Sequence, residues 1–498
     1  MAAAAGDRPA VVEGATVITY AGLNAEVNRL VSGLRALGLH GGERAVWCGP
    51  NSSKVLAFMH ACRKLGLVAV PLSYRFTSSE MWHVIDDSGA ALVAIDVEHA
   101  PRLAELSGRL PHAHHRVVYG GAHEGMTTWE EVAALGTADE PPPPADYGAA
   151  MMYTSGTTGR PKGAVRTRSD RALIGAMLAE LSFGSAEVHL TTGPLYHAGP
   201  NAFALLTHIT GGTIVVQRSF DPAEWLSLVE RHRVTSTFVA PTHLKRIVSL
   251  PDAVLAGADL SSMRTLIANA APVPYALKQE VVAKLGDWFL YEAYGSTELG
   301  IAAILRPEDQ LARPGSCGRA YGGIELRVVD TDGRDAPVGT AGELFVRTAL
   351  AVDGYHGGAD DLESLDGGWK SVGDIAYLDD DGYLYICDRR SDMVITGGMN
   401  VYPAEVEAVL HAHPDVGDAA VFGVPDEEWG ERVHAVVQPR EGHGLDLADL
   451  ESFTATRLAG FKRPRSWAQR AVLPRTDSGK LLKRLLRDEH WAGRQTRV

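Results

Sequence analysis

Cysteine is scarce in this chain, and its few copies are scattered. The 498 residues contain four cysteines, and none has the short spacing to another that binds a metal ion; they are Cys48, Cys62, Cys317 and Cys387. This argues against a disulfide framework and against a zinc site. It favours the reducing conditions of the cytoplasm, so we expect a cytoplasmic protein.

Long apolar runs are also missing. No stretch approaches the ~18 consecutive apolar residues that a helix needs to cross a bilayer, so we expect no integral membrane segment. The opening MAAAAGDRPAV lacks the basic start and the long apolar stretch of a secretory signal. The composition is otherwise that of ordinary soluble proteins, with 45% hydrophobic and 22% charged residues.

Positive charge is in deficit over the whole chain but not at its end. The net charge of −14 at pH 7 argues against nucleic acid as a partner. Residues 457–498, however, contain twelve Lys or Arg against three Asp or Glu. Two interpretations of this segment stay open, namely a solvated basic helix and tail or a site for a polyanionic ligand.

The length predicts at least two domains, because one hydrophobic core rarely serves so many residues. Apolar residues recur at helical spacing over 19–39, with Thr19 as a cap, and short apolar runs at 44–48, 68–72 and 91–96 are typical of buried strands. This alternation predicts βαβ units and a mostly parallel sheet with helices on both faces. Later segments, 344–350 and 382–390, have the pattern of exposed strands.

Two features divide the chain. Four prolines at 141–144 predict a stiff, extended linker between structural blocks. After residue 400 the pattern restarts: Pro403 opens a helix at its preferred first position, and two strands, a helix and a further strand follow. This C-terminal unit of roughly a hundred residues is large enough to be a domain of its own.

The segment YTSGTTGRPKG, residues 153–163, is dense in small residues. Such a loop presents many N–H and O–H donors with little bulk, which suits phosphate oxygens, and Lys162 adds a positive charge. A flexible turn has the same composition. Lys162 lies between Pro161 and Gly163, so the segment is not a Walker A loop. No G-x-G-x-x-G follows an early strand, so a Rossmann dehydrogenase has no support.

Seven segments together carry a resemblance over nearly the whole chain. They are YTSGTTGRPKG at 153–163, PLYHAG at 194–199, NAAPVP at 269–274, YGSTE at 294–298, VGD at 372–374, DRRSDMVITGGMNVYP at 388–403 and PRTDSGK at 474–480. In order and spacing they resemble the adenylate-forming superfamily, and within it the acyl-CoA synthetases. The resemblance implies an α/β fold with a large N-terminal domain, residues 1–389, of mostly parallel sheets flanked by helices. A small, mobile α+β domain, residues 390–498, would carry a catalytic lysine.

Members of this superfamily convert a carboxylate and ATP into an acyl-adenylate and pyrophosphate, and then pass the acyl group to an acceptor, most often CoA. Attack of one anion on another requires positive charge and aligned donors. The resemblance implies that Lys480 bridges the carboxylate and the α-phosphate, that Thr297 contacts the α-phosphate, and that Glu298 binds Mg²⁺. His197 would gate the acyl pocket.

The implied ATP site spans the chain. The loop from Thr154 to Gly159 and Lys162 would hold the β- and γ-phosphates, and Tyr294 would stack on the adenine. Asp374 would accept hydrogen bonds from both ribose hydroxyls, and Arg389 would reach the same ribose. The full implied set is Thr154, Ser155, Gly156, Thr157, Thr158, Gly159, Lys162, Asn269, Ala270, Ala271, Pro272, Tyr294, Gly295, Ser296, Asp374 and Arg389.

In the resembling enzymes the small domain turns about a hinge after adenylation and completes a CoA channel. The hinge position, usually Asp or Lys, is Ser391 here. The resemblance implies a CoA site made of Gly397, Gly398, Trp429, Lys462 and Arg463. The chain differs from the usual motifs of the superfamily at two further places: Asn269 stands where Gly or Ser is usual, and SVGD replaces TGD. These differences do not change the expected mechanism, but they leave the identity of the acid substrate open.

The acid is constrained by what surrounds the PLYHAG segment. Residues 196–219 contain no Asp or Glu, which disfavours an amino acid, because a buried ammonium without a counter-charge is costly. The implied acyl pocket, with His197, Gly199, Phe203 and Gly300, is apolar and has room. This favours a medium or long fatty acid or an aromatic acid over acetate or malonate.

We therefore expect an ATP-dependent acyl-CoA synthetase with ATP and Mg²⁺ as cofactors and CoA as co-substrate, working as a monomer or homodimer. Two alternatives stay open. One is an adenylate-forming biosynthetic enzyme with another acceptor, such as an amine, or with an unusual acid. The other is a non-catalytic nucleotide-binding protein.

Overall fold

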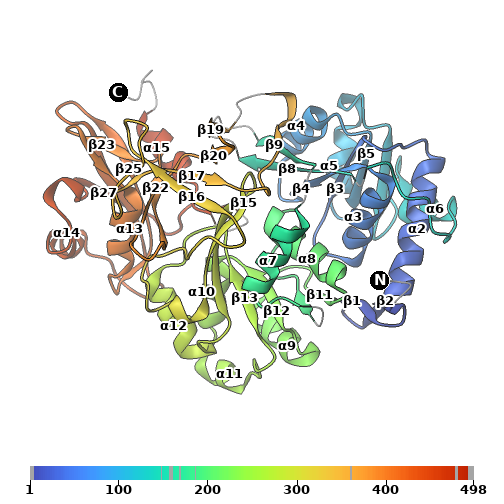
Figure 1. The fold of residues 1–498 in the computed structure, drawn as a ribbon, viewed down its shortest axis with the longest axis horizontal. Helices are drawn as coiled ribbons and strands as arrows, with labels where there is room; N and C mark the ends of the chain where they lie inside the picture. Colours follow the sequence, from blue (N-terminus) through green and yellow to red (C-terminus); the bar gives the residue numbers. More distant parts are fainter. Residues whose placement is uncertain are drawn as a thin grey trace.

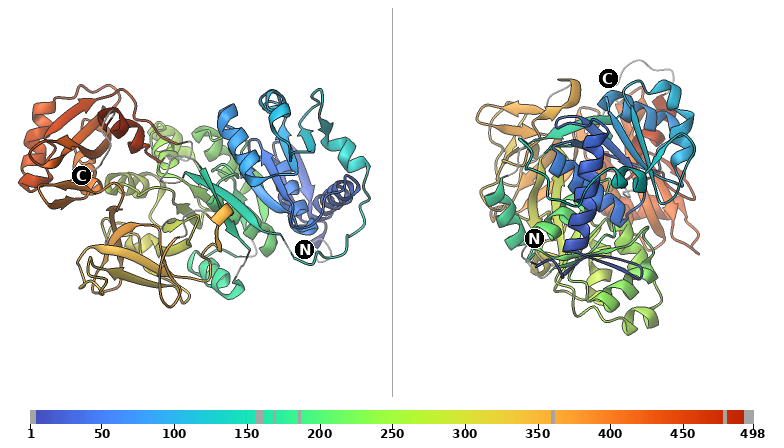
Figure 2. Two further views of the ribbon diagram at one scale, coloured as in Figure 1. Left: turned by 90° about the horizontal axis from the view of Figure 1, so that it is seen from above. Right: turned by 90° about the vertical axis from the view of Figure 1, so that its right-hand side faces the viewer.

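The computed structural model describes residues 5–146, 148–155, 161–167, 170–184, 187–358, 362–476 and 480–491. In this part of the chain the strands form four sheets. The molecule is elongated, with the N-terminal sheet at one end and the C-terminal sheet at the other (Figures 1 and 2). It is a mixed α/β fold with a large N-terminal part and a smaller C-terminal part, as predicted.

The first sheet contains the segments at 44–48, 68–72 and 91–96 that the sequence predicts as buried parallel strands. Its order is β18 (Gly354–Tyr355), β9 (Pro161–Arg166), β8 (Ala150–Ser155), β4 (Val68–Leu72), β3 (Arg44–Cys48), β5 (Leu92–Asp96), β6 (His115–Tyr119) and β7 (Thr127–Thr128). The strands from β8 to β7 pair in parallel, and β9 and β18 add antiparallel partners. Its helices are α2 (Tyr20–Ala36), α3 (Ser53–Leu65), α4 (Ser78–Ser88), α5 (Ala100–Glu105) and α6 (Trp129–Ala134).

Thr19 caps α2 as predicted, because its side chain accepts a hydrogen bond from the backbone N–H of Gly22. The tetraproline segment that precedes β8 forms neither helix nor strand.

The second sheet is also parallel in its interior. Its order is β15 (Gly300–Leu305), β14 (Leu290–Ser296), β13 (Thr265–Ala268), β12 (Ser236–Val239), β10 (Val188–Leu190), β11 (Thr213–Val216), β1 (Pro9–Glu13) and β2 (Thr16–Thr19). Its helices are α7 (Arg171–Glu180), α8 (Ala198–Thr210), α9 (Pro222–His232), α10 (Pro241–Val248), α11 (Asp252–Gly257) and α12 (Tyr275–Leu285).

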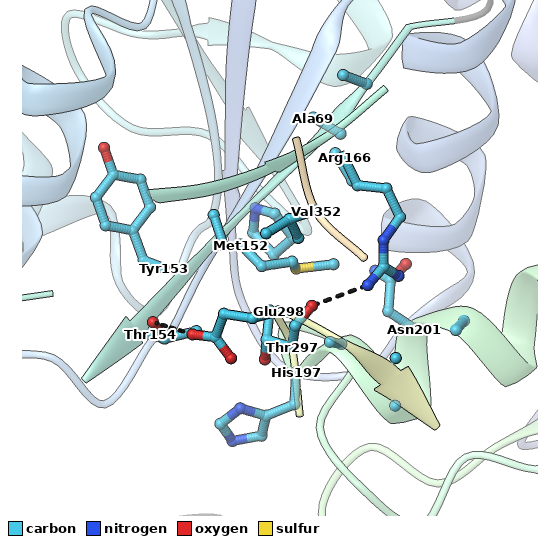
Figure 3. A pocket seen from close by; sticks show the side chains of 18 of the residues that line it. Ala69, Met152, Tyr153, Thr154, Arg166, His197, Asn201, Thr297, Glu298 and Val352 are labelled. Carbon is cyan, nitrogen blue, oxygen red and sulfur yellow. Dashed lines mark hydrogen bonds between the residues drawn. The ribbon is translucent and has the colours of Figure 1, made fainter. Parts of the chain in front are cut away.

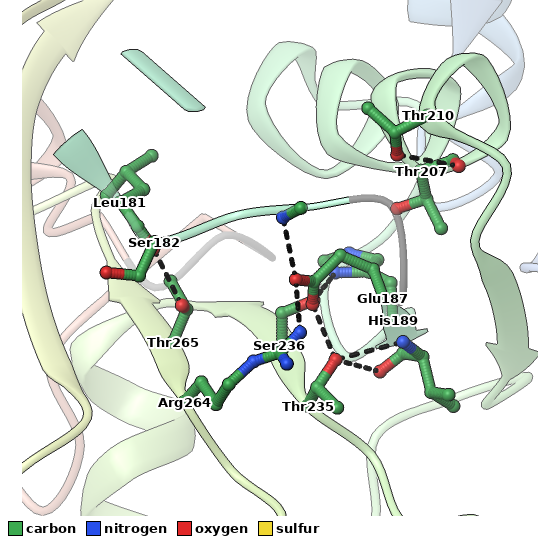
Figure 4. Close-up of polar contacts among 12 residues, drawn as sticks. Leu181, Ser182, Glu187, His189, Thr207, Thr210, Thr235, Ser236, Arg264 and Thr265 are labelled. Atoms are coloured by element: carbon green, nitrogen blue, oxygen red, sulfur yellow. Dashed lines mark hydrogen bonds and ion pairs between the residues drawn. The ribbon is translucent and has the colours of Figure 1, made fainter. Parts of the chain in front are cut away.

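A buried carboxylate ties this second sheet together (Figure 4). Glu187, just before β10, is 1% exposed. It accepts hydrogen bonds from the Thr235 hydroxyl beside β12 and from Arg264 at 2.7 Å. A buried charge that is paired and hydrogen-bonded in this way fixes the register of neighbouring segments.

The third sheet is antiparallel and consists of β19 (Glu363–Leu365), β20 (Trp369–Ser371), β17 (Gly342–Arg347), β21 (Asp374–Leu378) and β22 (Leu384–Arg389), with β16 (Glu325–Val329) paired to β17. The prediction that two of these strands are exposed is wrong. Leu344, Phe345 and Val346 of β17 and Leu384 of β22 are buried, because the sheet packs one face on the core that it shares with α7 and β15.

The C-terminal sheet has a hydrophobic core of its own. It consists of β24 (Met399–Val401), β23 (Val394–Thr396), β26 (Gly430–Pro439) and β25 (Val416–Asp426), with β27 (Ser466–Gln469) on β26. Its helices are α13 (Pro403–His411), α14 (Leu447–Ala455) and α15 (Lys483–Trp491). Pro403 is the first residue of α13, as predicted. A separate core supports a separate domain, and the boundary between residues 389 and 390 stays a prediction.

Much of the basic segment after residue 457 is paired within the C-terminal unit. Lys462 binds Glu405 at 2.7 Å, Arg475 binds Asp418 at 2.6 Å and Lys483 binds Glu407 at 2.8 Å. These pairs favour the structural interpretation of this charge over a dedicated polyanion site. In the described ranges no helix combines the length and the apolar character that a membrane span requires.

Candidate active site

A cavity of about 1820 Å³ lies where the sheets meet. Its walls come from β8, β9, the start of α8, the end of β14 and the loops after β13 and β22, and the C-terminal unit contributes Thr476 and Lys480. The four residues predicted as catalytic, His197, Thr297, Glu298 and Lys480, all line this one cavity.

The phosphate-loop motif borders the cavity through its flanks. Thr154 on β8 pairs with Lys162 on β9 across an antiparallel ladder, and both line the cavity. The Lys162 ammonium lies 5.9 Å from the centre of the Tyr355 ring. The predicted residues Gly156, Thr157, Thr158 and Gly159 and the side chain of Ser155 lie outside the described part of the chain.

Among the described residues, Glu298 is held through one of its two carboxylate oxygens (Figure 3). Its Oε1 accepts hydrogen bonds from the Thr154 hydroxyl at 3.1 Å and from the Tyr355 hydroxyl at 3.0 Å. No described residue donates to Oε2, although Glu298 lines the cavity. A carboxylate oriented through one oxygen and open at the other is suited to a hard cation such as Mg²⁺.

Lys480 approaches the cavity from the C-terminal unit. Its backbone N–H donates to the Thr476 hydroxyl at 3.0 Å, and the Thr476 N–H donates to the Lys480 carbonyl at 2.8 Å. Burial lowers the pKa of Lys480 below its ordinary 10.5, and Arg389 lowers it further, while Asp392, Asp374 and Glu298 act in the opposite direction. Lys480 is thus a partly desolvated cation within electrostatic reach of the predicted metal and ribose ligands.

Asp374 is engaged at both of its oxygens. The Tyr294 hydroxyl donates to Oδ2 at 2.5 Å, and Arg389 Nε lies 3.4 Å from Oδ1. Burial and the Asp374 charge raise the pKa of Tyr294 well above its usual value. Arg389 lines the cavity, whereas Tyr294 and Asp374 lie behind its wall. The structure therefore brings the three together but exposes only the arginine to the cavity.

The loop after β13 borders the cavity and is held by a hydrogen bond to the buried Glu292. Asn269 and Ala270 line the cavity, whereas the other two predicted residues of this loop, Ala271 and Pro272, do not. Glu292 accepts a hydrogen bond from the Val273 N–H at 3.1 Å and forms an ion pair with Lys278, whose side chain is 1% exposed.

Ala270 has a φ of +77°, a left-handed conformation that is rare for a residue with a Cβ. Such strain is typical of segments that present backbone groups to a ligand.

The four predicted acyl-pocket residues line the cavity, with one correction about space. A Cβ on Gly199 would lie 2.3 Å from the Phe238 ring, so the room that this glycine leaves is filled by a side chain of the protein. Apolar space is supplied instead by a group of partly buried and buried residues around it: Met59, Ala69, Met152, Ile174, Met177 and Leu206.

The predicted CoA residues are not part of this cavity. None of Gly397, Gly398, Trp429, Lys462 and Arg463 is among the described residues that line it. Gly397, at φ +57°, lies against the Trp429 indole, where a Cβ would approach within 2.5 Å, and Arg465 stacks 4.4 Å from the centre of that ring. The predicted hinge residue Ser391 does line the cavity.

Tyr355 and Arg166 are among the cavity residues that the sequence analysis did not single out. Tyr355, which donates to Glu298, lies in a two-residue strand with no recognisable pattern. Arg166 is the last residue of β9 and lines the cavity. The sequence does mark Arg166 as a charged residue directly after the apolar residues Ala164 and Val165. No motif, however, assigns it a role.

The flanks of a nucleotide-loop motif, a carboxylate with one open oxygen and a lysine of the C-terminal unit line one cavity, which is the set of residues expected of an adenylate-forming ligase. The chain belongs to the AMP-binding enzyme family: the model of that family matches residues 1–356, and the model of the AMP-binding enzyme C-terminal domain matches residues 405–480.

The relatives cover nearly the whole chain. A feruloyl-CoA synthase of an Amycolatopsis species is 39% identical over 95% of this chain and 94% of its own length. The fatty acid–acyl-carrier-protein ligase ScoC of Streptomyces coeruleorubidus is 34% identical over 98% and 95%. Among solved structures, the amide bond synthetase McbA of Marinactinospora thermotolerans superposes with a TM-score of 0.86 at 28% identity, over 97% of this chain and 96% of its own.

Proposed function

We propose that this protein is an ATP-dependent acid–CoA ligase. In the first step a carboxylate oxygen of the acid attacks the α-phosphorus of ATP, and pyrophosphate leaves. In the second step the CoA sulfur attacks the acyl carbonyl carbon, and AMP leaves. The observation that carries the proposal is the convergence of Lys480, Thr297, Glu298 and Arg389 on one cavity that also has an apolar part.

The residues divide the work of the first step. Thr154 and Lys162 hold the terminal phosphates, and the partly desolvated Lys480 neutralises the carboxylate and the α-phosphate as they approach. Arg389 and Asp374 position the ribose. In the described structure the two oxygens of Asp374 already contact Tyr294 and Arg389. Asp374 can therefore accept hydrogen bonds from the ribose hydroxyls only if it shares or changes these contacts.

Glu298 is the residue of this site that would hold Mg²⁺, through the oxygen that no described residue occupies. The ion supplies charge neutralisation at the phosphate oxygens. Thr154 and Tyr355 orient the carboxylate, so they act as positioning residues for it.

For the acid we propose an aromatic or a medium to long fatty acid. The apolar part of the cavity supports either kind, as do a feruloyl-CoA synthase and a fatty acid ligase among the relatives. For the acceptor, the CoA ligases among the relatives support CoA. An amine is the second candidate, because the similar solved structures include an amide bond synthetase.

The test measures pyrophosphate release with a panel of aromatic and fatty acids, with and without CoA, and with an amine in place of CoA. Release that requires an acid and is accelerated by CoA, with an acyl-CoA product seen by mass spectrometry, supports the proposal. Turnover only with the amine supports the second candidate. Failure of every acid to release pyrophosphate contradicts both and favours a non-catalytic nucleotide-binding protein.

A further inference from the structure

Arg166 is a charged side chain beside the apolar part of the cavity. It is the last residue of β9, opposite Ala150 of β8, and it lines the cavity. In Figure 3 its guanidinium extends from the strand toward Thr297 and Asn201, beside Met152 and Val352. An arginine in such surroundings is desolvated and needs partners for its five donors.

The protein supplies few of those partners. Nη2 donates to the Thr297 carbonyl at 2.9 Å. Nε is fully buried and has no hydrogen-bond partner among the described residues. No described carboxylate lies within ion-pair distance of the guanidinium, and burial lowers the pKa of Arg166. Arg166 is partly buried, and desolvation penalises a charge that has no close counter-charge, so an acceptor in the cavity would stabilise this guanidinium.

The nearest acidic groups are already engaged. Glu298 accepts from Thr154 and Tyr355. Asp353 accepts from the N–H and the hydroxyl of Thr167, both at 2.7 Å. Both acids therefore stabilise Arg166 only at a distance, and Arg166 itself lines the cavity.

The position of Arg166 indicates which substrate it meets. Figure 3 shows Thr154 and Glu298 on one side of Thr297, and Arg166 and Asn201 on the other. The first side borders Lys162, the partner of Thr154 on β9. The second side borders Ala69 and Met152, which belong to the apolar part of the cavity. The guanidinium therefore lies beside the apolar part of the cavity, on the side of Thr297 away from Glu298.

We propose that Arg166 is a specificity-determining residue that binds an oxygen on the tail of the acid, so that the preferred substrate is an oxygen-bearing acid and not a plain hydrocarbon acid. The inference rests on the proposed ligase function. The shared chemistry is a hydrogen-bond acceptor, which a hydroxyl, an ether, a carbonyl or a second carboxylate can supply. In apolar surroundings such a bond discriminates strongly, because an acid without the oxygen leaves the guanidinium unpaired.

The test compares matched acids with the intact enzyme. The pairs are cinnamic acid with its 4-hydroxy and 4-carboxy derivatives, and octanoic acid with octanedioic acid, each measured as kcat/KM for acid-dependent ATP–pyrophosphate exchange. We expect the wild type to prefer the best oxygen-bearing acid by about 10- to 100-fold over its plain partner. A comparison of the 4-hydroxy with the 4-carboxy derivative shows whether Arg166 prefers a neutral or an anionic oxygen.

Three variants separate specificity from structure. Arg166→Met should abolish the preference by lowering kcat/KM for the oxygen-bearing acid alone, with an unchanged KM for ATP. Arg166→Lys should restore part of it. The matched control Arg347→Met removes an arginine of β17 that pairs with Glu325 outside the cavity, and should leave the preference unchanged.

Three results would overturn the inference: no preference in the wild type, an equal loss for all acids in Arg166→Met, or a raised KM for ATP. If Arg166→Met does not fold, the wild-type preference and Arg166→Lys still decide. Failure of every acid to support exchange in the wild type is a different result, which contradicts the proposed function itself.

Discussion

Two faces of the C-terminal unit differ in whether their residues line the cavity. The loop with Thr476 and Lys480 closes the cavity and lies within electrostatic reach of Glu298 and Asp374. The face with Gly397 and Trp429 lies away from the cavity. Among the described residues, Lys480 therefore lines the cavity, whereas Gly397 and Trp429 do not. If both faces are used, the unit must rotate between the steps, and the two faces should fail separately when they are mutated.

Removing the Lys480 charge should have the largest effect. We expect Lys480→Ala to slow acyl-adenylate formation by about 10²- to 10³-fold, because a preorganised cation at the reacting anions is lost. Transfer to CoA from chemically prepared acyl-adenylate should stay near the wild-type rate. Rapid-quench measurement of each step separates them. Lys245→Ala, which removes a lysine paired with Glu280 on the surface, is the control. Equal losses in both steps would contradict a face-specific role.

Neutralising Glu298 tests the other side of the same cavity. Glu298→Gln keeps the shape of the side chain and its link to Thr154, but removes the charge that would hold Mg²⁺. We expect adenylation to fall about 10- to 100-fold and to require more Mg²⁺ for half-maximal rate. The measurement is a titration of Mg²⁺ at fixed ATP. An unaltered Mg²⁺ dependence would show that Glu298 does not hold the ion.

The Trp429 face should give the opposite pattern. Trp429→Ala removes the ring that packs on Gly397 and stacks with Arg465, and we expect about a tenfold rise in KM for CoA with an unchanged rate of adenylation. Trp288→Ala, at a half-exposed tryptophan outside the cavity, is the matched control and should change neither step. A slower adenylation step in Trp429→Ala would remove the distinction between the faces.

The pH dependence of adenylation should show the smallest but most specific effect. Lys480 acts as a cation, and burial lowers its pKa, so activity should be constant at lower pH and fall as the pH rises through a value below 10.5. Lys480→Arg should move this alkaline limb upward, because arginine stays charged. The pH profile of kcat for pyrophosphate release checks this. An alkaline limb that is identical in both proteins would assign it to another group.

Much of the fold could be predicted from the sequence, because local patterns are strong there. The cap at Thr19, the buried strands of the first sheet and the helix opened by Pro403 follow from periodicity and capping alone. The burial of β17 was missed although its three consecutive apolar residues, Leu344, Phe345 and Val346, are a pattern typical of a buried strand; a run this short does not reveal which core it meets. That core is assembled from α7, β15 and β22, which are distant in the sequence.

The candidate site was predicted where motifs exist and missed where only the fold brings residues together. The motif residues Lys480 and Glu298 both line one cavity, and their roles stay predictions. Tyr355, by contrast, reaches Glu298 across 57 positions of sequence, and no local pattern marks it. Gly199 shows the converse error, since a small residue indicates a close approach but does not say that Phe238 makes it.

The most direct test of the central claim is a crystal structure with a non-hydrolysable acyl-adenylate mimic, an acyl sulfamoyladenosine. The account predicts the sulfamoyl group between Thr297 and Lys480, the ribose beside Arg389, and the acyl tail along Met152 and Arg166. A nucleoside bound elsewhere, or an acyl tail that leaves the cavity without passing Arg166, would contradict it.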